Sequence, residues 1–289
     1  MPVDPKSFQK KLQYQSTASA QRLMADLEDI AKIDQFAEQE KARQNKVLIA
    51  AFITLFVSIF LTIVLPPLGI LLLIGSIVTT VYAGIRLSQL NRIDLANYRY
   101  GLVQKLLGML SRDLPENANL SLKLILDKPT EKRKKLGTVP HPHRQGWKID
   151  QFRDPWLTLR GRLLDGTRFL ITATELHQTA HGWKRGSSGK NKYKTKPKTK
   201  GSELGLTLIY PRRKYGAIQV LERDAMGAIH LPNGVRLKQW KMTGKALRLG
   251  VKTPPDPTAS DQGLYNTLTM MFLSLYQILN LARTLSKKK

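Results

Sequence analysis

The chain has 289 residues, no cysteine and a formal net charge of +26. Without cysteine the chain cannot form disulfides or thiolate metal sites, and it has no cysteine nucleophile. A charge this far from zero favours an anionic partner, which can be lipid headgroups, nucleic acid or an acidic protein face.

The first 46 residues divide into two parts. Residues 1–16 include prolines at positions 2 and 5, and we predict a flexible N-terminus there. Over residues 17–46, apolar side chains recur at three- and four-residue steps, which predicts a cytoplasmic amphipathic helix with Ser16 or Thr17 as its N-cap. The apolar stripe consists of Ala20, Leu23, Leu27, Ile30 and Ala37.

Residues 47–85 contain no Lys, Arg, Asp or Glu. Two stretches of roughly 18–20 apolar residues flank Pro66–Pro67, and each is about long enough to cross a bilayer core of about 30 Å. Proline ends the first helix because it lacks an N–H and clashes with the preceding turn. We therefore predict a transmembrane helical hairpin over 47–87, with spans at 47–65 and 68–85. The alternative is a core hairpin of a large soluble protein.

Basic residues flank both spans. Lys41, Arg43 and Lys46 precede the first span, and Arg86 and Arg92 follow the second, whereas the connecting turn has no charge. The positive-inside rule then places both termini on the cytoplasmic side. The chain is expected to be an integral membrane protein with nearly all its soluble mass in the cytoplasm.

Small residues recur at four-residue spacing along the second span, and such rows let helices approach closely. Packing of the second span on the first is the favoured interpretation. A docking face for another membrane subunit is the alternative. The helix-packing residues are Gly75, Ser76, Thr79, Thr80, Ala83 and Gly84.

A second cytoplasmic helix is predicted over 88–113, and Leu114–Pro115 ends it. It is similar in length to the helix over 17–46, so the two helices can run antiparallel as a stalk. That arrangement would place Ile30 near Gln104 and Leu23 near Ser111. The alternative is two independent helices.

Over residues 120–253 the apolar period changes to two, which predicts a basic, antiparallel β-rich domain. Strands at 156–164 and 167–174 flank Asp165–Gly166, a strong hairpin signal. A second hairpin is predicted from 228–231 and 235–240 around Pro-Asn-Gly. Further strands are expected at 205–210, 217–221 and 247–251. The predicted strands do not alternate with helices, so a parallel sheet is not expected.

The last segment, 258–289, is predicted to be a helix with a basic tail. Residues 264–282 have no charged side chain, but inserting them would carry Lys287–Lys289 outward, against the positive-inside rule. We favour packing on the sheet or at the membrane interface, with a third span as the alternative. The predicted fold class is an α+β membrane protein with a two-span hairpin, a helical stalk, a β-rich cytoplasmic domain and a C-terminal helix.

The strongest functional signal is a polybasic loop predicted at 182–202. Lysines occupy every second position from 190 to 200, so an extended chain would place them on one face. Near an anionic leaflet each Lys or Arg contributes on the order of 1 kcal/mol. The alternative is a solvated loop. The predicted anionic-partner-binding residues are Lys132, Arg133, Lys134, Lys135, Lys184, Arg185, Lys190, Lys192, Lys194, Lys196, Lys198 and Lys200.

Three other chemistries have weaker signals. Trp183 and Tyr193 among the lysines suit base stacking, so nucleic acid is the second choice of partner. Residues 186–190 lack the first glycine and the final hydroxyl residue of a P-loop. His177 and His181 have the spacing of a zinc helix but no adjacent glutamate. No metal, cofactor or catalytic residue is predicted.

Together these features predict a non-catalytic scaffold, tether or assembly factor anchored in a membrane. It would hold acidic lipid or an acidic protein face at the cytoplasmic surface, within a membrane protein complex. The alternatives are a membrane-tethered nucleic-acid-binding protein and a small-molecule sensor whose pocket the sequence does not reveal.

Overall fold

The computed structural model describes residues 8, 11–93, 95–187, 189–255 and 261–287. The chain forms two compact units, and each is described by itself. The first unit contains residues 26–96. The second contains residues 11–25 and everything after residue 96. The class is α+β, with one antiparallel eight-stranded sheet and two long apolar helices.

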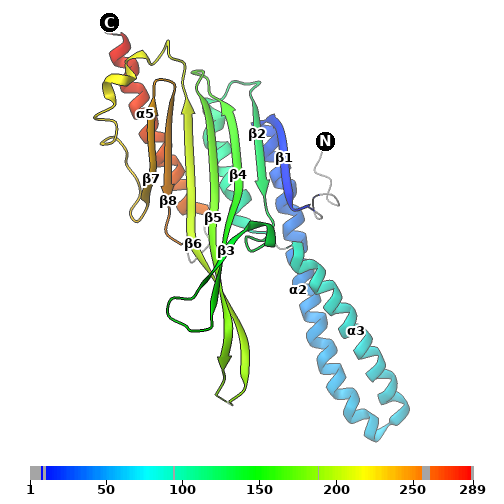
Figure 1. Ribbon diagram of the computed structural model, residues 1–289. Helices are drawn as coiled ribbons and strands as arrows, with labels where there is room; N and C mark the ends of the chain where they lie inside the picture. The colour runs from blue at the N-terminus through cyan, green and yellow to red at the C-terminus, as the bar shows by residue number, and fades with distance from the viewer. Residues whose placement is uncertain (1–7, 9–10, 94, 188, 256–260, 288–289) are drawn as a thin grey trace. The chain divides into compact units, whose positions relative to one another are not determined.

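The first unit is a helical hairpin. Helix α2 (Ala20–Val64) and helix α3 (Pro66–Ile93) are joined at Leu65 (Figure 1). The prolines open α3, where a missing N–H costs no hydrogen bond, so the second helix begins at residue 66 and not at 68. Both helices are long and apolar enough to span a membrane. Only 11% and 17% of their most apolar stretches are buried, whereas a core helix of a soluble protein would be mostly buried.

The two helices pack through small residues. A Cβ atom on Gly69 would lie 2.3 Å from the backbone nitrogen of Thr62, so only glycine fits this close approach. The hydroxyls along the contact donate to carbonyls of their own helices, which satisfies them in an apolar setting. The buried small residues of this contact are Ala51, Ser58, Gly69, Ser76 and Ala83.

The predicted row of small residues on the second span therefore divides between two faces. Ser76 and Ala83 are buried and Thr80 is half-buried, as expected for packing on the first span. Gly75 and Thr79 are exposed, and a Cβ on Gly75 would meet nothing within 4 Å. Docking of another subunit on that outer face stays a prediction.

The second unit is built on the sheet, whose strand order is β1-β2-β4-β5-β6-β8-β7, with β3 paired to β4. All pairs are antiparallel. Alternating leucines such as Leu122 and Leu124 direct one face of each strand to the core. The strands are β1 (Gln13–Ser19), β2 (Asn119–Ile125), β3 (Lys135–Pro140), β4 (Lys148–Arg162), β5 (Arg168–Arg185), β6 (Asn191–Ile209), β7 (Arg236–Thr243) and β8 (Ala246–Lys252).

Two helices cover one face of this sheet, and the other face is open (Figure 1). They are α4 (Asn97–Leu110) and α5 (Asp261–Lys287), which contact each other. Phe272 of α5 packs edge-on against Phe169 of β5, with ring centroids 6.3 Å apart. The apolar side of α5 is thus buried against the sheet, as predicted for this helix. Three short 3₁₀ helices complete the unit: η1 (Ser111–Asp113), η2 (Lys132–Lys134) and η3 (Gly216–Leu221).

The Asp165–Gly166 turn joins β4 to β5, which confirms that hairpin. The Asp165 carboxylate accepts hydrogen bonds from the Thr167 amide (2.7 Å) and hydroxyl (2.8 Å) and from the Tyr215 hydroxyl (2.8 Å). Burial alone would raise the pKa of Asp165, but these hydrogen bonds lower it. Gly166 has a φ of +90°, a conformation that glycine adopts without strain.

Several predicted boundaries are wrong. Residues 13–16 belong to strand β1, and most of the predicted flexible segment before them lies outside the described residues. The first helix starts at Ala20, and it continues into the apolar hairpin without a break. The predicted helix over 88–113 is divided among the end of α3, α4 and η1. The pairing of the two stalk helices stays a prediction.

The second predicted β-hairpin is also wrong. Residues 228–231 form no strand, and β7 instead pairs with β8 through a short turn at Gly244–Lys245. Residues 217–221 lie in η3, where Ile218 and Leu221 are buried at a three-residue spacing that suits a 3₁₀ turn. A run of five residues was too short to distinguish the two conformations.

Candidate functional site

The predicted polybasic loop is regular β structure, which corrects the expectation for 182–202. Strands β5 and β6 stay paired from His177↔Thr199 to Arg185↔Asn191, and we call residues 177–199 the arm. Strand β4 accompanies the arm only as far as Lys148↔His181, so the tip is a two-stranded ribbon. The arm projects beyond the end of the sheet (Figure 1). At the turn, the Gly186 amide donates to the Lys190 carbonyl at 2.8 Å.

A β-bulge at the base of the arm decides which way its side chains point. Glu175 pairs with Ser202 and His177 pairs with Thr199, so Leu176 stands opposite both Lys200 and Gly201. Gly201 has a φ of +94°. The extra residue in β6 places the side chains between the bulge and the tip, residues 191–199, on the opposite face from the one their spacing to Leu204 would give. Without it, Lys200 and the preceding lysines, which lie towards the tip, would share the face that α4 and α5 cover.

The bulge gathers the lysines on the open side of the sheet. Lys184 faces Lys192 across the ribbon, and Lys194, Lys196 and Lys198 follow on the same face. We call these five side chains the lysine face, and all are exposed. The predicted residues Lys190 and Lys200 lie in the turn and the bulge, and Arg185 lies on the opposite face.

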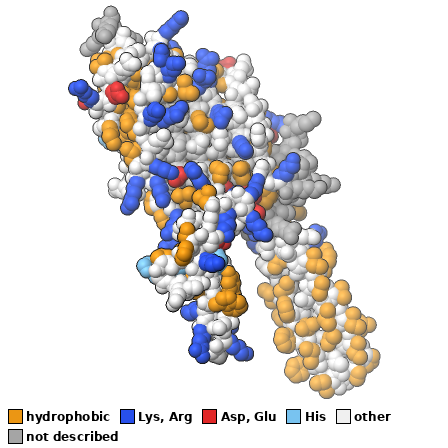
Figure 2. All heavy atoms as spheres, in the orientation of Figure 1, with side chains coloured by type: hydrophobic (Ala, Val, Ile, Leu, Met, Phe, Trp, Pro, Cys, Tyr) orange, Lys and Arg blue, Asp and Glu red, His pale blue; other side chains and the backbone are white. Residues whose placement is uncertain are grey.

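The lysine face continues a basic sheet surface. Figure 2 shows Lys and Arg side chains over the front of the sheet and around the tip of the arm. Exposed residues on the open face include Arg160 and Arg248. The acid Glu203 on this face contacts Arg153 at 3.0 Å and also Lys238. Negative charge on this side is therefore sparse and already paired.

The opposite face of the arm tip is aromatic. Trp183 and Tyr193 face each other across the two strands, with ring centroids 5.4 Å apart and edge-on geometry. The Tyr193 hydroxyl is 2.6 Å from His181 Nδ1. Trp183 is 65% exposed and Tyr193 is 53% exposed. Two large aromatic side chains at the end of a thin ribbon are thus open to solvent.

The second predicted basic cluster, 132–135, does not form an external anion site. Lys134 is buried, and it pairs with Asp127 and, at 2.8 Å, with Asp154. Arg133 also pairs with Asp127, and Lys135 Nζ lies 2.7 Å from Asp150. The prediction of an anionic partner is wrong for Lys134. Carboxylates of this unit already match the charges of Arg133 and Lys135. Among the described residues, Lys132 is the one member of the cluster without such an ion pair.

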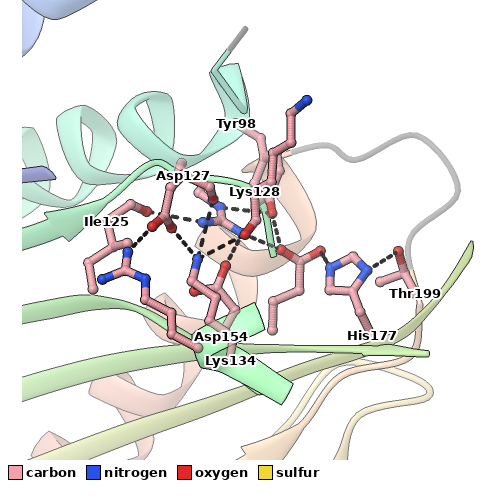
Figure 3. Close-up of polar contacts among 11 residues, drawn as sticks. Tyr98, Ile125, Asp127, Lys128, Lys134, Asp154, His177 and Thr199 are labelled. Atoms are coloured by element: carbon pink, nitrogen blue, oxygen red, sulfur yellow. Dashed lines mark hydrogen bonds and ion pairs between the residues drawn. The ribbon is translucent and has the colours of Figure 1, made fainter. Parts of the chain in front are cut away.

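A buried ionic network lies at the base of the arm (Figure 3). The Arg99 guanidinium, on α4, is 2.7 Å from both Asp154 on β4 and Glu175 on β5. Arg99 also donates to the Ile125 carbonyl on β2 at 3.0 Å. Glu175 in turn accepts from the Tyr98 hydroxyl at 2.5 Å. One side chain therefore holds α4 to three strands at the point where the arm begins.

The network reaches into the arm itself. His177 Nε2 is 2.9 Å from Glu175, and the Thr199 hydroxyl is 3.5 Å from His177 Nδ1. Sequence reasoning missed this network. The available signal was Arg99, which occupies the helix position where the apolar stripe of Leu95, Leu102 and Leu106 predicts an apolar residue. Its carboxylate partners are 55 and 76 residues away, so no local pattern identifies them.

The pKa values follow from this geometry. Burial alone would raise the pKa of Glu175, but the hydrogen bond from His177, the charge of Arg99 and the hydrogen bond from Tyr98 lower it to about 2. Burial lowers the pKa of Lys134, and the contact with Asp154 offsets this only in part.

We expect the second unit to lose stability in acid because of Glu175. Its folded pKa, about 2, lies below the ordinary value of 4.5, so its contribution is complete above pH 4.5 and declines as the pH falls towards 2. The shift corresponds to a contribution of about 3 kcal/mol to the free energy of unfolding. Denaturant unfolding of wild type and Glu175→Gln between pH 7 and pH 2.5 measures this. The variant should show a smaller fall in unfolding free energy; an equal fall in both proteins would contradict the assignment.

A cavity of about 340 Å³ adjoins Glu175, and its lining includes Tyr98, Thr199, Val235 and Leu264. Its volume suits a small molecule. The carboxylate on its wall, however, already has Tyr98, Arg99 and His177 as partners. The sequence could not reveal the cavity, because strands and helix residues distant in the chain form it.

The two histidine pairs of the sequence lie in different settings. His177 and His181 both lie on β5, where four residues span about 13 Å, too far to share one ion. His141 and His143 contact each other in the turn between β3 and β4, with ring centroids 6.3 Å apart. Within the described ranges, no group of three His, Asp or Glu side chains could hold a metal ion.

The chain matches no protein-family model, no curated protein and no solved structure.

Proposed function

We propose that this protein is a membrane-anchored tether that holds an anionic partner at the cytoplasmic membrane surface. It acts by binding and not by catalysis. The observation that supports this most is the lysine face of the arm, where five exposed side chains of one sign share one surface. Like charges at this spacing repel one another, so an anion that neutralises them is bound favourably.

The anchor in this proposal is the α2–α3 hairpin. Large apolar side chains such as Phe60 and Leu71, each 72% exposed, would be costly in water and favourable in lipid. Basic residues on both flanks orient the two termini towards the cytoplasm. Anchorage keeps the arm near the bilayer at a high effective concentration, so each lysine contact can be individually weak.

The test uses the full chain in nanodiscs of neutral phosphatidylcholine. Flotation with added phosphatidylglycerol vesicles measures the affinity for an anionic surface. Lys192→Gln, Lys194→Gln and Lys196→Gln together should weaken binding by about 3 kcal/mol, or about 100-fold, at low salt. The loss should shrink as ionic strength rises, because salt screens exposed charges.

The matched control removes three exposed charges elsewhere in the same unit, at Arg213, Arg223 and Lys245. A general effect of net charge would weaken binding equally in both triple variants. Equal losses, or no anionic-vesicle binding by the wild type at low salt, would overturn the proposal. Tight, salt-dependent capture of a single-stranded RNA oligonucleotide without vesicle binding would favour the nucleic-acid alternative.

A further inference from the structure

We propose that the partner of the arm is the lipid bilayer itself, and that the arm tip lies within the headgroup layer. In this arrangement Trp183 and Tyr193 point towards the acyl chains and the lysine face points towards phosphates and water. The inference rests on the proposed function, because it identifies the anionic partner as lipid. It assigns a role to the aromatic face, which electrostatic capture alone does not use.

The two faces of the tip have the chemistry of an interfacial element. Trp and Tyr favour the boundary between headgroups and acyl chains, because their rings are apolar and their N–H or O–H groups remain hydrated. Lysine can bury its methylene stem and keep its ammonium at the phosphates. The alternation along β6, with Tyr193 between Lys192 and Lys194, therefore produces an amphipathic ribbon.

The ribbon can enter the headgroup layer without leaving its strands unpaired. From Gly182↔Lys194 to Arg185↔Asn191 the strands of the tip pair with each other. The turn is also paired, through the Gly189 amide and the Gly186 carbonyl at 3.0 Å. Since unpaired backbone groups are costly in a dehydrated layer, this pairing lowers the cost of entry, and the backbone groups on the two outer edges are satisfied by water of the headgroup layer. The polar turn, which includes Ser187 and Lys190, limits entry to the headgroup layer.

The lysines and the aromatic rings lie on opposite faces of the arm tip. This placement favours lipid over the other anionic partners. A single nucleic-acid strand needs phosphate contacts and stacked bases on one surface. An acidic protein docked on the lysine face would leave Trp183 and Tyr193 in water. The headgroup layer surrounds a thin ribbon on both sides, so only this partner satisfies the lysines and both aromatic rings together.

The absence of native cysteine makes the test direct, because one introduced thiol is the only labelling site. Lys194→Cys places a fluorophore on the lysine face. Thr195→Cys combined with Lys194→Gln places it on the aromatic face at the same net charge. The full chain is reconstituted in vesicles that contain phosphatidylglycerol. A quencher on the acyl chains should quench the label at 195 at least about twofold more strongly than the label at 194.

The opposite order of quenching, or equal quenching at both labels, would overturn the inference. Lysine-face adsorption by charge alone would shield position 194 from aqueous iodide and leave 195 accessible. In that case vesicle binding and its loss in the triple lysine variant would persist, so the proposed function would stand. If the wild type shows no binding that depends on anionic lipid, both fail.

A second measurement separates the aromatic contribution from charge. Trp183→Ala with Tyr193→Ala should weaken binding of the nanodisc-held chain to phosphatidylglycerol vesicles by about tenfold or more, because apolar area is no longer buried. The slope of vesicle affinity against salt concentration should stay the same, because no charge is removed. Val220→Ala, which trims another exposed apolar side chain, is the control and should change binding less than twofold. Unchanged affinity in the aromatic variant would contradict insertion.

Discussion

Replacing Arg99 with methionine is expected to lower the free energy of unfolding of the second unit by about 3–5 kcal/mol. Arg99 is 1% exposed, and its partner Asp154 is fully buried. Methionine fills similar space but leaves Asp154 and Glu175 without their shared guanidinium. Two buried carboxylates then face each other across paired strands without the cation between them, which is unfavourable in a buried setting.

Denaturant unfolding followed by tryptophan fluorescence measures this loss. Trp156 is a suitable reporter because it is fully buried and the Arg99 guanidinium lies 5.3 Å from its ring centroid. Arg160→Met makes the same substitution at an exposed site of the same unit and should change stability by less than about 0.5 kcal/mol. A loss below about 1 kcal/mol for Arg99→Met would show that the network is not needed for stability.

A rescue variant tests the electrostatic explanation. Combining Arg99→Met with Asp154→Asn and Glu175→Gln removes the two facing carboxylates that have lost their shared guanidinium; Asp154 otherwise keeps only Lys134 as a cation. We expect this triple variant to recover part of the lost stability, because two facing amides cost less to bury than two facing carboxylates that have lost the cation between them. If the triple variant were less stable than Arg99→Met alone, hydrogen-bond geometry rather than charge would explain the effect.

Substituting alanine for Gly201 is expected to destabilise the second unit by about 2 kcal/mol or more. The φ of +94° is strained for any residue with a side chain. In addition, the new Cβ would lie 2.1 Å from the Thr253 carbonyl oxygen, so the backbone must shift. If the bulge straightens to relieve the clash, the lysines between the bulge and the tip move to the other face. Gly201→Ala should then also weaken vesicle binding.

Gly189→Ala is the matched control for backbone conformation. Gly189 has a φ of +76°, but a Cβ there would meet nothing within 4 Å. The loss of unfolding free energy in Gly189→Ala should therefore be limited to the cost of the backbone conformation, about 1–2 kcal/mol. Unfolding free energies and vesicle binding are compared for both variants. Equal losses in stability and unchanged lipid affinity would contradict the role assigned to the bulge.

Within the second unit, the buried ionic network fixes the base of the arm. The ionic network holds Glu175 and His177, the strand residues from which the arm extends. Above its folded pKa Glu175 remains charged, so the network persists at neutral pH. Loss of Arg99 should therefore loosen the arm as well as the fold. A faster rotation of a spin label at Lys194→Cys in the Arg99→Met background would show this.

Local chemistry was sufficient for the parts of the structure that the sequence predicted. The run over 47–85 forms two apolar helices, since it has no charged side chain and its hydroxyls bond to carbonyls of their own helices. The Asp165–Gly166 turn and the alternating leucines of β2 depend on neighbours in the chain. The helix over 261–287 follows from its own apolar periodicity. For these elements the sequence by itself determined the outcome.

Which basic residues are exposed and which are buried depends on the tertiary structure. The run 132–135 and the run 190–200 look alike as sequence, yet Lys134 is buried by carboxylates from two other segments, whereas the lysine face is exposed. One glycine bulge, opposite Leu176 in the hairpin partner β5, sets the face on which those lysines lie. Such choices depend on the register between strands and on long-range ion pairs, which local spacing does not contain. Only the folded sheet brings Arg99, Asp154 and Glu175 together.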